Sequence, residues 1–137
     1  MTSPSLEVQG LLVSRLKNTG AVSSLINGVY DRVPTDPWGT KQAYISFGAE
    51  DMTPDDADCV EGEEITIQID VWSRKVGRVA CKEIMSAVKA ALHLRDDLIL
   101  AENILVECRL ELSRILQDPD GLTTHGVMQF SFSVEAA

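Results

Sequence analysis

Residues 104–135 read ILVECRLELSRILQDPDGLTTHGVMQFSFSVE, the pattern of two long strands joined by a turn. The even positions are apolar in both halves, at Ile104, Val106, Cys108, Leu110 and Leu112 and again at Met128, Phe130, Phe132 and Val134. Successive side chains of a strand point to opposite faces, so each half has one apolar and one polar face. Pro119 suits the first central position of a turn, and Gly121 can adopt the positive φ needed to leave it. The stretch therefore predicts an antiparallel hairpin whose apolar face must be covered by helices or by another sheet.

A third strand and the covering helix are predicted directly upstream. The clearest single strand is residues 65–72, where Ile65, Ile67, Ile69 and Val71 share one face. Residues 74–93 then change to the helical period, with one apolar face at Ala80, Cys81, Ile84, Val88, Ala91 and Leu92. We predict antiparallel strands at 65–72, 104–116 and 122–134 and a helix at 78–93 that lies across their apolar faces.

The first half of the chain completes the predicted fold. Ser3 or Ser5 can cap a first helix that runs to about Asn18. Residues 43–47 alternate well enough for a fourth strand, and residues 29–33 and 98–100 are expected to be short extended segments. The fold class is thus α+β, a single domain over residues 1–137. Its antiparallel sheet has about four main strands, with two helices packed on one face.

Composition narrows the class of protein. The chain has 137 residues and is 45% hydrophobic, as expected for one globular domain with a real core. We expect no membrane span and no secretion signal, because the sequence has no long apolar run and no basic, then apolar, N-terminal segment. Its three cysteines are odd in number and widely separated, which argues against a disulfide scaffold and favours a reducing cytoplasm.

The formal charge of −9 comes almost entirely from one segment. Residues 50–64 contain eight acidic residues and no basic ones; without those eight, 13 acidic residues remain against 12 basic ones. We expect a flexible acidic loop at 49–63, because like charges repel and the segment has little apolar surface to offset the entropy of ordering. The acidity also argues against sequence-specific nucleic-acid binding, which normally requires a basic face.

The sequence predicts no catalytic, cofactor or metal site. His93 is expected to end the second helix by meeting its exposed carbonyl groups or the negative end of its dipole, and His125 follows the hairpin turn. The acidic clusters invite a Ca²⁺ interpretation, but no glycine lies at the sixth position counted from Asp51 or Asp56.

A basic cluster opens the second helix. Arg74, Lys75, Arg78 and Lys82 surround its first turns, where the helix dipole disfavours each cation by ~0.3–1 kcal/mol. Four such residues, among only 12 basic residues in the chain, indicate a partner surface. Trp72, just before the cluster, either packs against the sheet or joins the same interface.

Five segments, in this order and spacing, resemble the tail-completion, or tail-terminator, proteins of long-tailed phages and gene transfer agents. They are GVYDRVP at 28–34, VWSR at 71–74, GR at 77–78, IMSAV at 84–88 and LQDPDGLTTHG at 116–126. The resemblance covers residues 6 to 134. The acidic segment is longer or more acidic than the family pattern, so its role is not carried over.

The resemblance implies a structural virion protein without enzymatic activity. It implies a ring homo-oligomer, usually a hexamer, at the head-proximal end of the tail tube, with DNA able to pass through the ring. The ring would end tube polymerisation and present a joining surface, so its partners would be the tail tube protein and the head–tail connector protein. The location would be the virion tail, after assembly in the host bacterial cytoplasm.

Two other classes remain open at this point: another head–tail connector or neck adaptor, and a small α+β ligand-binding domain or enzyme. For assembly we hypothesise that the acidic loop of one subunit docks near residues 74–82 of a neighbour or of a tube subunit, because opposite charges can set the register of such contacts. The interface residues that we predict are Asp55, Asp56, Asp58, Trp72, Arg74, Lys75, Arg78, Lys82, Asp118, Asp120 and His125.

Overall fold

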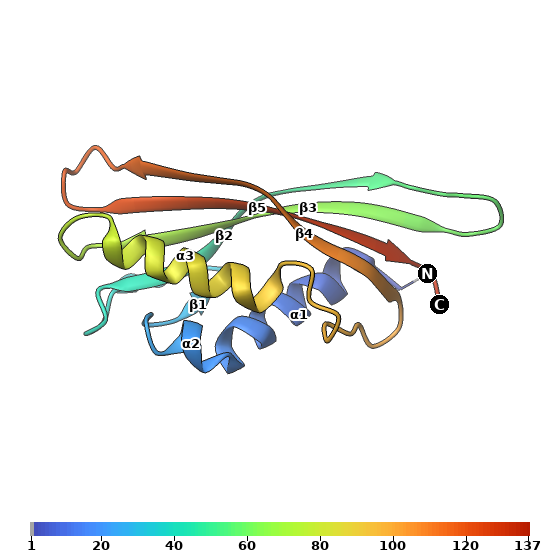
Figure 1. Cartoon of the computed structure of the whole chain (residues 1–137), viewed down its shortest axis with the longest axis horizontal. Helices are drawn as coiled ribbons and strands as arrows, with labels where there is room; N and C mark the ends of the chain where they lie inside the picture. Colours follow the sequence, from blue (N-terminus) through green and yellow to red (C-terminus); the bar gives the residue numbers. More distant parts are fainter. Residues whose placement is uncertain (1) are drawn as a thin grey trace.

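The computed structural model describes residues 2–137, which form a five-stranded sheet with all three helices on one of its faces (Figure 1). The sheet order is β1-β2-β3-β5-β4. The helices are α1 (Pro4–Asn18), α2 (Gly20–Ser23) and α3 (Val79–Leu92), and the strands are β1 (Val29–Tyr30), β2 (Ala43–Pro54), β3 (Gly62–Ser73), β4 (Ile104–Gln117) and β5 (Thr124–Glu135). None of the helices in these residues has the length and apolarity that a membrane span requires.

The predicted α+β class is confirmed, with additions. The pairs β2–β3, β3–β5 and β5–β4 are antiparallel. The short strand β1 runs parallel to β2, so the sheet is mixed, and α2 is a third helix that the sequence pattern did not predict. Residues 98–100 form no strand; Leu98 and Leu100 instead bury their side chains in the core as part of an irregular connection.

The predicted helices form where local signals favour them. Pro4 occupies the first turn of α1, and the Oγ atom of Ser3 accepts a hydrogen bond from the Leu6 amide at 3.3 Å. Helix α3 buries the predicted apolar face against the sheet, where Ile65, Ile67, Ile69 and Val71 of β3 are at most 2% exposed. The phases predicted for β3 and for the apolar positions of β5 are therefore correct.

The predicted phase of β4 is only partly correct. Cys108 and Leu110 pair with Phe132 and Phe130 on the helix-covered face, as predicted. The register shifts at Val106 and again at Glu111. At each of these two positions β4 contains one extra residue that has no partner in β5, and β5 itself continues regularly. A bulge of one residue exchanges the faces of all residues beyond it, because side chains alternate with a period of two. The residues that share the inner face of β5 are consequently Leu105, Cys108, Leu110, Ser113 and Ile115, whereas Ile104, Val106 and Leu112 are exposed.

The acidic segment is mostly strand rather than loop. Strand β2 continues to Pro54 and β3 begins at Gly62, with pairs such as Met52–Ile65 between them. Only residues 55–61, here called the hairpin tip, lie outside the strands, so the predicted loop at 49–63 was too long. The flexibility of this tip stays a prediction.

The two ends of the molecule differ in what they carry (Figure 1). The β2–β3 hairpin extends beyond the helices at one end, and the β4–β5 turn lies beside the start of α3 at the other. The acidic hairpin and the basic cluster, which are near in sequence, are therefore separated by most of the length of β3.

Candidate interaction surfaces

A row of three aromatic side chains and one leucine crosses the helix-free face of the sheet near the basic end. Tyr44, Trp72, His125 and Leu116 are successive cross-strand partners on β2, β3, β5 and β4. The Trp72 and His125 rings are stacked with centroids 3.7 Å apart, and Trp72 Nε1 donates a hydrogen bond to Ser46 Oγ at 2.9 Å. Cross-strand partners of this kind stabilise a sheet. The contacts of Trp72 are thus mainly within the subunit, and its side chain is half-buried.

His125 is held by a carboxylate from the neighbouring strand. Its Nε2 atom lies 2.7 Å from Oδ1 of Asp70, whose side chain is only 8% exposed. The same oxygen accepts a hydrogen bond from Gln68 Nε2 at 2.9 Å. Since the histidine side chain is itself 18% exposed, this pair sits at the surface of the open face and fixes the orientation of the ring under Trp72.

His93 ends α3 as predicted, but its side chain contacts β4 and not the carbonyl groups of the helix. Its Nδ1 atom accepts a hydrogen bond from the Leu110 amide at 2.9 Å. The next residue, Leu94, donates its amide to the Cys108 carbonyl at 2.7 Å. His93 and Leu94 thus form hydrogen bonds to backbone groups on the outer edge of β4. Without such partners, an edge strand presents these groups to other chains.

The predicted basic cluster divides into two parts. The Arg74 guanidinium lies 4.2 Å from the centroid of the Trp38 ring, a cation–π contact on the aromatic side of the molecule. Arg78 and Lys82 instead face a groove between α3 and β4. Within residues 2–137 neither these three side chains nor Lys75 forms an ion pair. The cluster therefore has no direct ion-pair partner in these residues, although, after the hydrogen bonds from Thr123 and Leu122, the Arg74 charge contributes to lowering the pKa of the Asp120 carboxyl.

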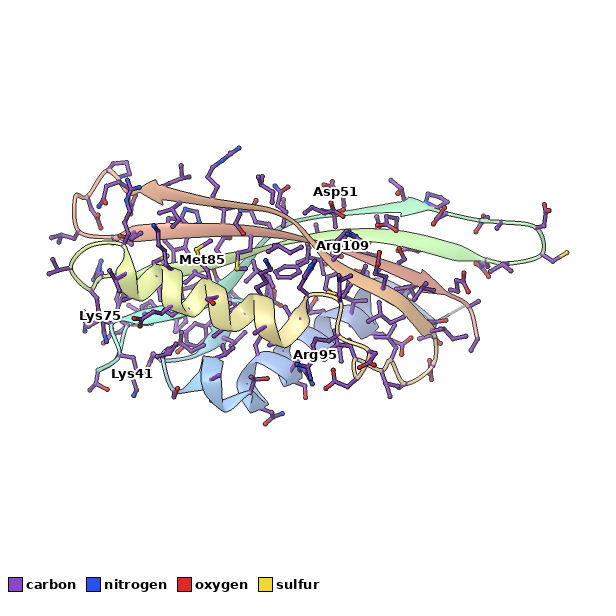
Figure 2. The ribbon with its side chains drawn as sticks, in the orientation of Figure 1. Lys41, Asp51, Lys75, Met85, Arg95 and Arg109 are labelled. Atoms are coloured by element: carbon purple, nitrogen blue, oxygen red, sulfur yellow. The ribbon has the colours of Figure 1, made fainter. Side chains whose placement is uncertain are left out.

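The groove was not predicted from the sequence. Its volume is about 420 Å³, and its lining residues are Arg78, Lys82, Met85, Ser113, Arg114 and Ile115. Figure 2 shows Met85 between α3 and the sheet and Lys75 near the end where α3 begins. The bulge at Glu111 is responsible for this lining, because it brings Ile115 to the inner face of β4. The apolar odd positions Leu105 and Ile115 were the signals in the sequence that contradicted an unbroken even pattern in β4.

The acidic residues predicted for the interface lie on the hairpin tip, at the far end from this groove. Asp55, Asp56 and Asp58 are exposed there, and Asp56 Oδ1 accepts the Gly62 amide at 2.9 Å. Ala57 and Val60 exchange two backbone hydrogen bonds, of 3.0 and 2.9 Å, which close a tight turn. The structure thus brings none of the predicted acidic tip residues near the basic cluster of the same subunit (Figure 1).

The turn residues Asp118 and Asp120 lie at the basic end and have local partners. The carboxylate of Asp120 accepts the amides of Leu122 and Thr123 and the Thr123 hydroxyl at 2.7–2.8 Å. These bonds, that of the Thr123 hydroxyl above all, lower the pKa of the Asp120 carboxyl. Asp118 donates its amide to the Thr123 carbonyl at 2.9 Å. Both residues therefore shape the β4–β5 turn.

Neither a metal-binding cluster nor an ionised buried thiol is found in the part of the chain that the structure describes. Across residues 2–137, no group of three or more histidine, cysteine, aspartate or glutamate side chains is arranged to hold a metal ion. The two buried thiols are held in their neutral form, since burial raises the pKa of Cys81 to about 11 and that of Cys108 to about 12.

Comparison with known proteins identifies the family. The family model described as "Tail completion protein gp17" matches residues 10–135. The tail completion protein gp17 of Bacillus phage SPP1 is 27% identical over 131 residues, which cover 95% of this chain and 93% of that protein.

Two solved structures share the fold. A chain from the virion of a native gene transfer agent particle has a TM-score of 0.87 and 23% identity, and covers 99% of this chain and 100% of its own. The structure of bacteriophage SPP1 gp17 has a TM-score of 0.61 at 23% identity, over 93% of this chain and 88% of that one. Because the family model matches nearly the whole chain, this protein belongs to the tail completion protein gp17 family and is a structural protein of phage-type tails, not an enzyme.

Proposed function

We propose that this protein forms a homo-oligomeric ring, a hexamer in the form implied by the resemblance, at the head-proximal end of a tail tube. There it stops tube polymerisation and provides the surface for head–tail joining. Its partners are further copies of itself, the tail tube protein and the head–tail connector protein. Assembly takes place in the cytoplasm of the host bacterium. Membership of a tail completion family supports this role, as does a similar fold found in the virion of a gene transfer agent.

The observation that supports a ring is the separation of charge between the two ends of the subunit. The hairpin tip is acidic, and the cations around the start of α3 lack ion-pair partners within residues 2–137. Two different and complementary patches favour a head-to-tail contact between copies, which closes into a ring when the rotation per subunit permits it. A symmetric antiparallel dimer would also pair the tip of each copy with the basic end of the other, and the mass measurement described below distinguishes it from a ring.

Two measurements test this function. The first is the mass of the purified protein, free and in the presence of tail tubes, by light scattering or native mass spectrometry. The second adds the protein to growing tail tubes and follows tube length by electron microscopy. A ring that caps the tubes and stops their growth is the expected result. A protein that joins heads to finished tails but leaves tube growth unchanged would be an adaptor, and a monomer without effect on either would refute the proposal.

A further inference from the structure

We propose that the groove between α3 and β4 is the docking site for the hairpin tip of a second copy of this chain. The groove is the one lined by Arg78, Lys82, Met85, Ser113, Arg114 and Ile115. The tip consists of residues 55–61, between β2 and β3. This inference rests on the proposed ring and names the contact that joins its subunits.

The groove combines excess positive charge with an apolar floor. Arg78 and Lys82 are exposed and make no ion pair in the described chain, residues 2–137, and the exposed Arg114, which alternates with the inward Ser113 and Ile115, contributes to the lining only from the edge of β4. Arg78 also holds the N-cap position of α3 without a side-chain hydrogen bond, where the helix dipole opposes a cation. Met85 and Ile115 supply the apolar part of the lining. An occupant that suits the groove must therefore bring both carboxylates and a small apolar side chain.

The hairpin tip has this composition and is already shaped. It carries Asp55, Asp56, Asp58 and Glu61 around Val60, whose side chain is an exposed hydrophobic. The paired backbone hydrogen bonds between Ala57 and Val60 close its turn in the free subunit. A preformed tip loses less conformational entropy on docking than a disordered loop would.

The distance between the two surfaces makes the occupant a second copy. The tip and the groove lie at opposite ends of the elongated sheet (Figure 1), so one chain cannot fill its own groove. Each subunit would give a tip to one neighbour and receive a tip from the other, as a ring requires. A nucleic-acid phosphate backbone fits less well, because it would leave the apolar floor uncovered and would approach a chain of charge −9.

Disulfide trapping tests the contact with a native thiol. Cys59 is exposed on the tip, whereas Cys81 and Cys108 are buried. The variant Ser113→Cys places a second accessible thiol in the groove, and Lys82→Cys does so from α3 should the first variant fold poorly. Mild oxidation, with and without tail tubes, is expected to give a covalent ladder that ends at the size of the ring.

Two controls define the site. Cys59→Ser combined with Ser113→Cys is expected to lose the ladder. Glu107→Cys, an exposed position at the other end of β4, is expected to give none although Cys59 is present. A ladder of equal yield in either control would overturn the docking site.

The remaining outcomes separate this inference from the proposed function. Wild-type rings that cap tubes, together with Ser113→Cys and Lys82→Cys proteins that do not crosslink, would overturn the docking while the ring function stood. Crosslinked open chains that never cap tubes would support the docking and count against the terminator role. Binding of a short DNA duplex that is lost in Arg78→Glu/Lys82→Glu, without any crosslink, would make the groove a nucleic-acid site instead.

Discussion

Deleting Glu111 tests whether the bulges of β4 set the faces of that strand. Glu111 is the additional residue between Leu110 and Leu112, which face consecutive residues of β5. Without it, Leu110, Ser113 and Ile115 keep the same inward face, because regular alternation replaces the bulge. The matched control is deletion of Ser131 from β5, since its hydroxyl donates to the Glu111 carboxylate at 2.8 Å. Both deletions remove this one exposed hydrogen bond, so only the register differs between them.

The buried side chains decide the size of the difference. The lost hydrogen bond is worth about 1 kcal/mol, and deletion of Glu111 should cost about that much. Deletion of Ser131 must move either Phe132 and Val134 or Phe130 and Met128 to the open face, and all four are at most 1% exposed. Exposing two such side chains costs about 3–6 kcal/mol, a large part of the 5–15 kcal/mol that stabilises a typical domain.

Urea unfolding followed by circular dichroism measures both effects. With a slope of about 2 kcal/mol per molar urea, the midpoint should fall by about 0.5 M for the Glu111 deletion and, since the same hydrogen bond is lost as well, by about 2–3.5 M for the Ser131 deletion. Equal losses in the two variants would refute the reasoning, since the bulge would then not be what accommodates the extra residue.

Three further predictions concern the hairpin tip, an exposed ion pair and the cysteines. The hairpin tip should keep its closed turn in the free subunit but show ¹⁵N order parameters below those of the adjoining strands, because its like charges repel one another, and values equal to those of the strands would contradict this. Hydrogen bonding to Arg95, with a further contribution from Arg15, lowers the pKa of Asp97 from its ordinary 3.8. The ionised Asp97 carboxylate therefore stabilises the fold fully above its unfolded-state pKa, and this stabilisation is lost as pH falls through the lowered folded-state pKa. The melting temperatures of the wild type and Asp97→Asn should consequently converge in acid. A thiol reagent at about pH 8 should label one cysteine in the native protein and three after denaturation, because the two buried thiols stay protonated; rapid labelling of all three would show that the core opens.

Regular local patterns were sufficient to predict the framework of this protein. The alternation around Ile67 and Phe130 predicted the inward faces of β3 and β5, and the helical period around Ile84 predicted α3. Each signal lies within one segment and is read directly from which side chains must leave water. The order of the turn and strand-end segments likewise indicated the family, which the comparisons confirm. Neither pattern required knowledge of which segments meet in space.

Only the tertiary structure decided the features that depend on a partner segment. The even pattern of β4 failed because pairing with a regular β5 forced bulges at Val106 and Glu111, and a bulge is a property of two strands. The acidic segment became a hairpin because β2 and β3 satisfy each other's backbone groups as far as Pro54 and Gly62, which charge composition alone did not reveal. The groove arose in the same way, since α3 and β4 are far apart in the sequence and meet only when both pack on the sheet. Local periodicity determines which face of an element is buried, whereas register, bulges and grooves depend on contacts between segments that the sequence separates.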